Sequence, residues 1–333
     1  MPQRTNICDL AKNQLVDGVY AIQNCQLGQT RTGKPFLKCL LADRTGRTPG
    51  RMWNASQELY ATLPTDGFVW LEGQAQPYQG EIQIIIHKIE SARPTEEQLL
   101  DLLPRTEHDI DEMFAELGRI LQTIEHAPLA ALIRTYLDDQ SLMERFRRAP
   151  AAMTLHHAFI GGLLEHTLQL LKVADPILPS YPKLNRDVVL AGLFLHDLGK
   201  CEELKWESGF DYTDDGRLVG HIARGVIRLE AKAKQCGDAG GEIPPPLLRV
   251  LTHIILSHHG KPEHGAQMVP ATPEAIFVSL MDNLDAKVNM AISATRNDKS
   301  AKSGGDFTEK IWALETRLYR PDPTKENQEN KRA

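Results

Sequence analysis

A histidine and an aspartate stand side by side at the end of an apolar run, and this pair constrains the chain more than any other feature. Residues 187–198 are mostly apolar, which predicts a buried helix, and Gly199 stands where a left-handed C-cap would end it. Burying His196 and Asp197 is costly unless something neutralises them, and a divalent metal ion is the strongest such partner. The alternative is a solvent-facing pair at a fraying helix end. The presence of further ligand-type side chains elsewhere in the sequence would favour the metal site over this alternative.

Histidines are concentrated in the same half of the chain. Nine of the twelve lie between His156 and His264, and several stand in contexts typical of helices or tight turns. An acid, Asp282, lies in the amphipathic stretch 274–290, one side of which we expect to face the core. The residues expected on that core-facing side are Ile276, Leu280, Leu284 and Val288.

Length and composition limit the class of protein. With 333 residues, the chain can form two domains that each bury a core. It shows no secretory signal and no run of about eighteen apolar residues, so we expect a soluble, cytoplasmic protein with no membrane partner. The five cysteines are scattered without a CxxC pair, which argues against a disulfide framework and a structural zinc site.

The N-terminal part is predicted to be β. Five short segments rich in β-branched, aromatic and other apolar residues are separated by turn residues, and a helical piece, 56–63, falls between the third and fourth. Five strands with a helix in that position is the order of an OB-fold, whose strand 2–3 face binds single-stranded nucleic acid. The predicted strands are 18–27, 36–43, 48–53, 68–76 and 81–90.

Basic and aromatic side chains on these strands suit a single strand of nucleic acid. Between residues 31 and 51, six basic residues face one acid, Asp43, and Tyr60 lies beside the strands. Each base stacked on an aromatic ring would contribute ~1–3 kcal/mol. The alternative is that the aromatics fill the core and the charges are ordinary solvated turns. The residues expected to contact nucleic acid are Arg31, Lys34, Phe36, Lys38, Arg51 and Trp53.

The pattern divides the chain into four parts. A capping box at 95–98 opens a helical stretch after the strands, and the last residues are polar and charged. We expect an OB-fold nucleic-acid-binding domain at 1–93, a helical connector at 94–149, an all-α domain at 150–320 and a disordered tail at 321–333.

Five motifs follow one another in the second half: GGLLEHT at 161–167, HDLGK at 196–200, LVGHI at 218–222, SHHG at 257–260 and DNLDAK at 282–287. This pattern resembles the HD-domain superfamily of metal-dependent phosphohydrolases, and it is more closely similar to the YhaM-type 3′→5′ exoribonucleases. Members of that family join an N-terminal OB-fold to an HD domain. The resemblance therefore covers nearly the whole chain and implies a multidomain α and β protein: an N-terminal OB-fold β-barrel followed by an all-α HD domain.

The resemblance also implies two groups of metal ligands that share Asp197 as a bridge. Mixed imidazole and carboxylate ligands suit manganese, our first expectation, and also Fe, Co, Ni or Zn, better than magnesium. We expect a divalent metal, two ions per site. The first group is His166, His196, Asp197 and Asp282, and the second is His221 with one or both of His258 and His259.

As the family implies it, the activity is that of a metal-dependent 3′→5′ exonuclease. It would hydrolyse phosphodiester bonds of single-stranded RNA, with DNA left open, through a hydroxide activated by two metal ions. Asp197, Lys200 and His259 are the residues expected in catalysis, although Lys200 could equally be a solvated lysine at a helix end.

Two alternatives remain. One is an HD-type nucleotide or cyclic-nucleotide phosphohydrolase with a regulatory OB domain; the residues 260–264 lack the Gly-Tyr-Pro signature of the cyclic-dinucleotide phosphodiesterases, which lowers the prospect of that substrate. The other is a single-stranded nucleic-acid-binding protein with a structural metal, which the surplus of ligands disfavours. Assembly into a homo-oligomer is left open.

Overall fold

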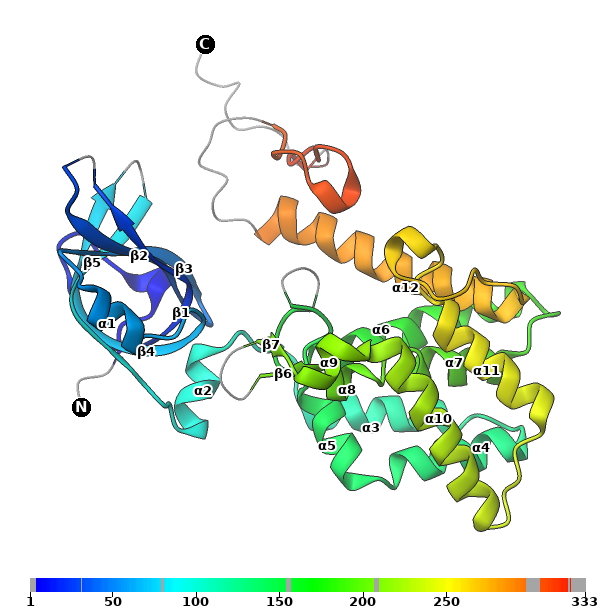
Figure 1. Cartoon of the computed structure of the whole chain (residues 1–333). Helices are drawn as coiled ribbons and strands as arrows, with labels where there is room; N and C mark the ends of the chain where they lie inside the picture. Colours follow the sequence, from blue (N-terminus) through cyan, green and yellow to red (C-terminus); the bar gives the residue numbers. More distant parts are fainter. Residues whose placement is uncertain are drawn as a thin grey trace.

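The computed structural model describes residues 4–30, 32–78, 81–153, 157–206, 210–297, 306–322 and 324. Figure 1 shows a β-barrel and a larger helical body, with helix α2 (Glu96–Leu102) between them. Arg31 lies outside the described residues, as does most of the tail expected at 321–333. Among the described helices, none is long and apolar enough to cross a membrane.

The N-terminal body is a closed five-stranded barrel with the strand order β1-β2-β3-β5-β4. Strands β3 and β5 pair in parallel and the other neighbours are antiparallel. Helix α1 falls between β3 and β4, so the predicted OB-fold order is confirmed. The elements are η1 (Ile7–Asp9), β1 (Leu15–Gln29), β2 (Pro35–Asp43), β3 (Gly46–Trp53), α1 (Gln57–Thr62), β4 (Gly67–Tyr78) and β5 (Glu81–Ser91).

Helix α2 connects the barrel to the helical body. The predicted capping box is present, because the Thr95 and Gln98 side chains each bond to the other residue's backbone N–H. At the other end of α2, Leu102 and Leu103 are buried against Ala21, Ala42 and Phe68 of the barrel. The connector is therefore seated on the barrel by apolar contacts.

The helical body is built around one hydrophobic core. Helix α7 lies at its centre, since all its residues from Val188 to Leu195 are buried. The connector helices α3, α4 and α5 contribute to the same core. The helices are α3 (Ile110–Leu121), α4 (Ala127–Leu137), α5 (Gln140–Arg148), α6 (Gly162–Ile177), α7 (Arg186–Leu195), α8 (Lys200–Glu203), α9 (Asp214–Leu218), α10 (Gly220–Asp238), α11 (Pro245–Ser257) and α12 (Pro273–Ile292). The shorter pieces are η2 (Leu178–Ser180), β6 (Leu204–Lys205), β7 (Asp211–Tyr212), η3 (Pro262–His264), η4 (Ser293–Asn297) and η5 (Trp312–Leu314).

The expected left-handed cap at Gly199 is wrong. Helix α7 ends at Leu195, and Gly199 has right-handed backbone angles, φ −62° and ψ −21°. A Cβ atom at this position would lie 2.0 Å from the backbone oxygen of His221. Glycine is required here because the start of α10 packs directly against its backbone, not because a helix must stop.

The expected inner side of α12 is also wrong. Ile276, Leu280, Leu284 and Val288 are between 46% and 62% exposed, whereas the buried side carries Ala275, Val278, Met281 and Asp285. The helix has apolar residues on two sides, and the buried one is the side that presents its carboxylates to the histidines of other helices. With Ile292, the exposed residues form a row at four-residue spacing that we call the outer ridge: Ile276, Leu280, Leu284, Val288 and Ile292.

Candidate metal centre

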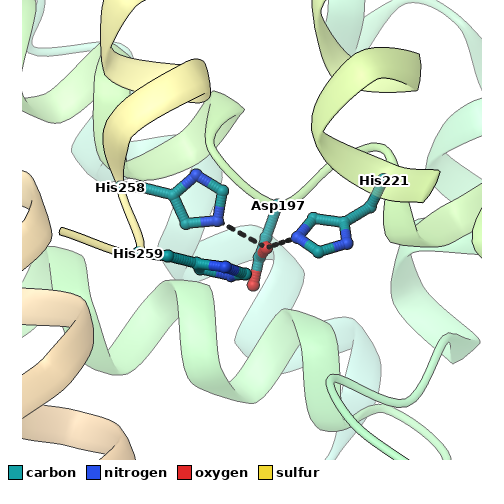
Figure 2. A group of neighbouring side chains, drawn as sticks. All are labelled: Asp197, His221, His258 and His259. Carbon is teal, nitrogen blue, oxygen red and sulfur yellow. Dashed lines mark ion pairs between the residues drawn. The ribbon is translucent and has the colours of Figure 1, made fainter. Parts of the chain in front are cut away.

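Asp197 lies between two groups of imidazoles. Its Oδ2 is 3.4 Å from His196 Nε2 and 3.9 Å from His166 Nε2. Its Oδ1 is 3.4 Å from His258 Nε2 and 3.6 Å from His221 Nε2 (Figure 2). One buried carboxylate thus presents a different oxygen to each group, which is the arrangement a bridging ligand needs.

Asp282 completes the first group. Its Oδ1, which projects from α12, is 3.3 Å from His166 Nε2 and 3.9 Å from His196 Nε2. Helix α6 supplies His166, and His196 is the C-cap residue of α7. Two neighbouring helices, α6 and α7, therefore meet the distant α12 at the four residues predicted for the first ion.

The second group combines Asp197 with three histidines. One ligand atom from each of Asp197, His221, His258 and His259 lies within 4.8 Å of the others. Figure 2 shows the three imidazoles surrounding the carboxylate. The structure brings both adjacent histidines, His258 and His259, to the carboxylate, so both are available as donors.

Two of the histidines are fixed by the ends of their own helices. His196 Nδ1 donates to the Leu193 carbonyl at 2.8 Å, and His258 Nδ1 donates to the Ile255 carbonyl at 2.7 Å. The last carbonyls of a helix lack partners within the helix, so each imidazole satisfies one of them. Placing the proton on Nδ1 leaves the Nε2 lone pair facing Asp197.

The other two imidazoles are fixed by carboxylates. His166 Nδ1 donates to Asp285 Oδ2 at 2.7 Å, and His221 Nδ1 donates to Glu203 Oε1 at 3.0 Å. The same Glu203 oxygen accepts the His221 backbone N–H at 3.1 Å. Asp285 follows Asp282 by three residues on one helix, so its position beside a predicted ligand is visible in the sequence, whereas no sequence pattern links Glu203 to His221.

Several atoms that face the centre lack hydrogen-bond partners. Among the described residues, Asp197 Oδ1 and the Nε2 atoms of His196, His221 and His258 are buried without one. Burying unpaired polar atoms is costly, and so many around one carboxylate would destabilise the fold unless a cation binds them. The donor set therefore fits divalent metal ions of the kind that accept imidazole and carboxylate ligands.

The surroundings of Asp197 favour its ionised form. Burial opposes its charge, but Lys200 and His196 outweigh burial and hold the pKa of Asp197 well below its usual value. Burial likewise disfavours the charged form of Lys200, yet Asp197 raises the pKa of the lysine above its ordinary value. The two groups form a buried ion pair, with Lys200 Nζ 2.7 Å from Asp197 Oδ2.

Most of the imidazoles with shifted pKa values are suited to metal binding. Burial lowers the pKa of His258, and it lowers the pKa of His259 to about 3, so both rings stay neutral. Burial also disfavours charge on His166, but its hydrogen bonds with Asp282 and Asp285 raise its pKa to about 9. At His166 a metal ion would replace the proton on Nε2.

Outside the centre, four of the six predicted nucleic-acid residues lie on two paired strands of the barrel and share its outer face: Phe36, Lys38, Arg51 and Trp53. Phe36 and Trp53 are cross-strand partners whose ring centroids are 5.6 Å apart, and Lys38 pairs with Arg51 along the same two strands. The Arg51 guanidinium lies 5.1 Å from the ring centre of Tyr78, a residue that the sequence did not single out. Trp53 and Tyr78 are 46% and 45% exposed. We call this set the stacking face: Phe36, Lys38, Arg51, Trp53 and Tyr78.

The remaining predictions for the barrel are mixed. Lys34 is exposed in the turn before β2, next to the stacking face in sequence. Tyr60, expected beside the nucleic-acid face, instead packs on the barrel core and its hydroxyl donates to the Cys25 carbonyl at 3.3 Å. Its ring therefore packs against the barrel interior and not on the face expected to stack with bases.

Comparisons with known proteins match both the barrel and the helical body. The HD domain family matches residues 163–287. A 3′-5′ exoribonuclease YhaM from Geobacillus sp. strain WCH70 is 34% identical over 308 residues, which is 92% of this chain and 92% of the relative. The 3′-5′ exoribonuclease YhaM of Bacillus subtilis strain 168 is 33% identical over 311 residues, covering 92% of this chain and 95% of the relative.

Proposed function

Since this chain belongs to the YhaM family of 3′-5′ exoribonucleases and is a metal-dependent 3′-5′ exonuclease, we propose that the cluster around Asp197 is its active site. The observation that carries this proposal is the convergence of buried, unpartnered donor atoms on the two oxygens of one carboxylate. A catalytic metal site needs such donors, held in place by other groups.

We assign two divalent ions to the two groups, with manganese as the first candidate. Asp197 would bridge them, and His259 would complete the second group. The ligands are His166, His196, Asp197 and Asp282 for one ion and Asp197, His221, His258 and His259 for the other. When bound, two such ions supply Lewis acidity and lower the pKa of a water molecule for attack on phosphorus.

Lys200 is the protein's own cation at this centre. Its ammonium lies beside the Asp197 oxygen and its side chain is 14% exposed, so it is close to the surface of the site. We propose that Lys200 binds a phosphate oxygen of the substrate and stabilises the charge that develops on it during hydrolysis.

The stacking face would hold the single strand upstream of the cleaved bond. Aromatic rings accept successive bases, and the nearby Lys38 and Arg51 track the phosphates. RNA is the substrate that the family indicates. We propose that single-stranded DNA is also cleaved, because stacking and phosphate contacts use features that both polymers share.

We further propose that the chain forms a homo-oligomer through the outer ridge. A continuous row of side chains at four-residue spacing packs against the same row of a second helix, the commonest way in which helices pack. The row exposes on the order of 400–500 Å² of apolar surface, which is the size of the largest apolar patch on a typical monomer. A second copy of this chain offers an identical row, as a two-fold interface requires.

The domain limits and the compartment stay proposals. We retain 1–93, 94–149, 150–320 and 321–333 as the limits, while noting that α3, α4 and α5 share the core of the helical body. The five cysteines are unpaired in the structure, which supports the expectation of a reducing, cytoplasmic environment.

The decisive experiment follows one labelled strand. The purified protein with Mn²⁺ is incubated with a 5′-labelled single-stranded RNA and its DNA counterpart, and the products are resolved at single-nucleotide steps. We expect a ladder that shortens from the 3′ end. Asp197→Asn should lose both the ladder and bound metal, whereas Asp211→Asn in the β6–β7 hairpin should retain them. Full activity of Asp197→Asn would refute the assigned site.

A further inference from the structure

A chain of polar contacts joins the connector below the barrel to the proposed ligand His166. It begins at Thr106, four residues after α2, and passes through Glu165, His157 and Asp285. No local sequence pattern links these four residues to one another. The role inferred for them below rests on His166 being a metal ligand, as proposed above.

Asp285 is the inner end of the chain. Its Oδ2 accepts the His166 Nδ1–H at 2.7 Å and lies 3.1 Å from His157 Nε2. Its Oδ1 accepts from Asn289 Nδ2 at 2.9 Å, one turn farther along α12. With both oxygens engaged from three directions, the carboxylate cannot rotate, and the His166 ring is held in a single orientation.

His157 and Glu165 continue the chain outward. The His157 side chain is buried, and its Nδ1 lies 3.7 Å from Glu165 Oε1, a polar contact that is longer than a hydrogen bond. The other oxygen of Glu165 accepts a hydrogen bond from the Thr106 hydroxyl. Glu165 directly precedes His166 in α6, so one turn of this helix presents Glu165 to the connector and His166 to the metal centre.

The backbone of the connector is tied to the same segment. Thr106 N donates to the Ile160 carbonyl at 2.9 Å, and Ile160 N donates to the Pro104 carbonyl at 2.9 Å. On the barrel side, Arg44 N donates to the Asp101 carbonyl at 3.3 Å. A short stretch of chain therefore touches the barrel at one end and the partners of His166 at the other.

Gly162 lets the backbone of His157 pack against the start of α6. A Cβ atom at Gly162 would lie 2.0 Å from the His157 carbonyl oxygen, so only glycine lets this segment rest on the start of α6. His157 itself has a left-handed backbone, φ 52°, which few residues with a branched or bulky side chain adopt. The fold thus accepts local strain to place this imidazole against Asp285.

We propose that His157 and Thr106 are positioning residues for the metal centre. His157 fixes Asp285, which orients His166, and Thr106 fixes His157 through Glu165. The connector seated on the barrel thereby sets the geometry of a metal ligand in the helical body. Loss of either residue weakens metal binding and slows turnover without removing any ligand.

The test is a titration of Mn²⁺ into the chelator-treated full-length protein, followed by calorimetry. His157→Asn suits the left-handed backbone but cannot reach Asp285, and we expect about tenfold weaker binding, the low end for loss of such a partner. Thr106→Val removes the hydroxyl at constant shape, and we expect about threefold weaker binding, the low end for one lost hydrogen bond, with Thr106→Ser near wild type. Thr135→Val, which loses a hydroxyl bond within α4, is the matched control and should bind normally.

The double variant tests whether Thr106 affects metal binding through His157 or independently of it. If Thr106 acts through His157, adding Thr106→Val to His157→Asn causes no further loss, whereas independent sites would multiply their effects. The kcat on a small phosphodiester should fall in parallel with metal affinity, while RNA affinity stays unchanged. Wild-type binding by Thr106→Val, or multiplying effects, overturns the inference. Wild-type binding by His166→Gln would instead overturn the ligand assignment itself.

Should His157→Asn not fold, the comparison of Thr106→Val with Thr106→Ser decides alone. The same hydroxyl accepts the His108 N–H at 3.1 Å, so Thr106→Val is expected to lower the melting temperature of the metal-free protein in either case. A purely structural role predicts wild-type metal affinity at a temperature well below unfolding, whereas a positioning role predicts weaker binding there.

Discussion

Lys200 Nζ lies 2.7 Å from the Asp197 oxygen that faces His166 and His196. The centre therefore contains a permanent positive charge at the position where a metal ion would share the carboxylate. Its charge repels the ion in the first group while it attracts the phosphate of the substrate.

Lys200→Gln should separate these two effects. We expect kcat to fall about 10²-fold, the loss typical of removing one charge-stabilising group, while Mn²⁺ affinity is unchanged or rises. Single-turnover kinetics and a metal titration measure the two quantities. Lys205→Gln, a surface lysine paired with Asp211, is the control. A fall in metal affinity would show that Lys200 supports the ligands and not the substrate.

Glu203→Gln tests the anchor of the second group. The amide keeps the shape but loses the charge that orients His221, so we expect the second ion to bind about tenfold more weakly while the first is retained. Metal content after dialysis and a Mn²⁺ titration check this. The exposed Glu230→Gln should behave as wild type. Equal retention of both ions by Glu203→Gln would contradict the anchor role.

Trp53→Ala tests the stacking face. We expect RNA binding to weaken by ~1–3 kcal/mol, the contribution of one stacked base, with KM for RNA raised accordingly. Hydrolysis of a small chromogenic phosphodiester should not change. Trp312→Ala removes an 88% exposed tryptophan outside the barrel and serves as the control. A similar loss on the small substrate would mean that Trp53 affects folding or the active site.

Leu280→Glu tests the outer ridge. Leu280 is 62% exposed, so a charge there costs little in a single chain but prevents two rows from packing together. Light scattering should show a smaller particle than wild type at an unchanged melting temperature. Leu15→Glu on the barrel, where the leucine is 75% exposed, should keep the wild-type size. A wild-type particle that is already monomeric would exclude the proposed interface.

Asp139→Asn should produce a stability loss that depends on pH. Asp139 caps α5 through Leu142 N and pairs with Lys232 at 2.8 Å, and the hydrogen bond from Lys232 lowers the pKa of the carboxyl. Asparagine keeps the cap but loses the charge, so we expect about 1 kcal/mol of destabilisation at pH 7. Because the folded pKa is depressed, the contribution is complete above about pH 4 and disappears as the pH falls through the folded value. Denaturant unfolding at pH 7 and pH 3 measures the difference; an equal loss at both would contradict the charge as its cause.

Local patterns predicted most of the fold. The five strands were predictable because β-branched and apolar segments are separated by turn residues, and α7 because its apolar run is unbroken. The motifs identified the side chains that meet around Asp197, since each stands in a short, ordered pattern. Local pattern and motif are both properties of adjacent residues, which a single sequence displays directly.

The partners of these side chains could not be predicted in the same way. Glu203 and His221 are separated by 18 residues, and His157 and Asp285 by 128, so no local pattern connects them. The buried side of α12 was ambiguous because apolar residues occupy two of its faces. Packing of the whole helical body against Asp282 and Asp285 decides between them, and this information is distributed over several helices.

The close contact at Gly199 limits which residues this position tolerates. A single added methyl group at residue 199 would collide with the His221 carbonyl and push α10 away from Asp197. The side chain that residue 199 lacks therefore sets how closely His221 can approach Asp197, although residue 199 itself offers no ligand atom.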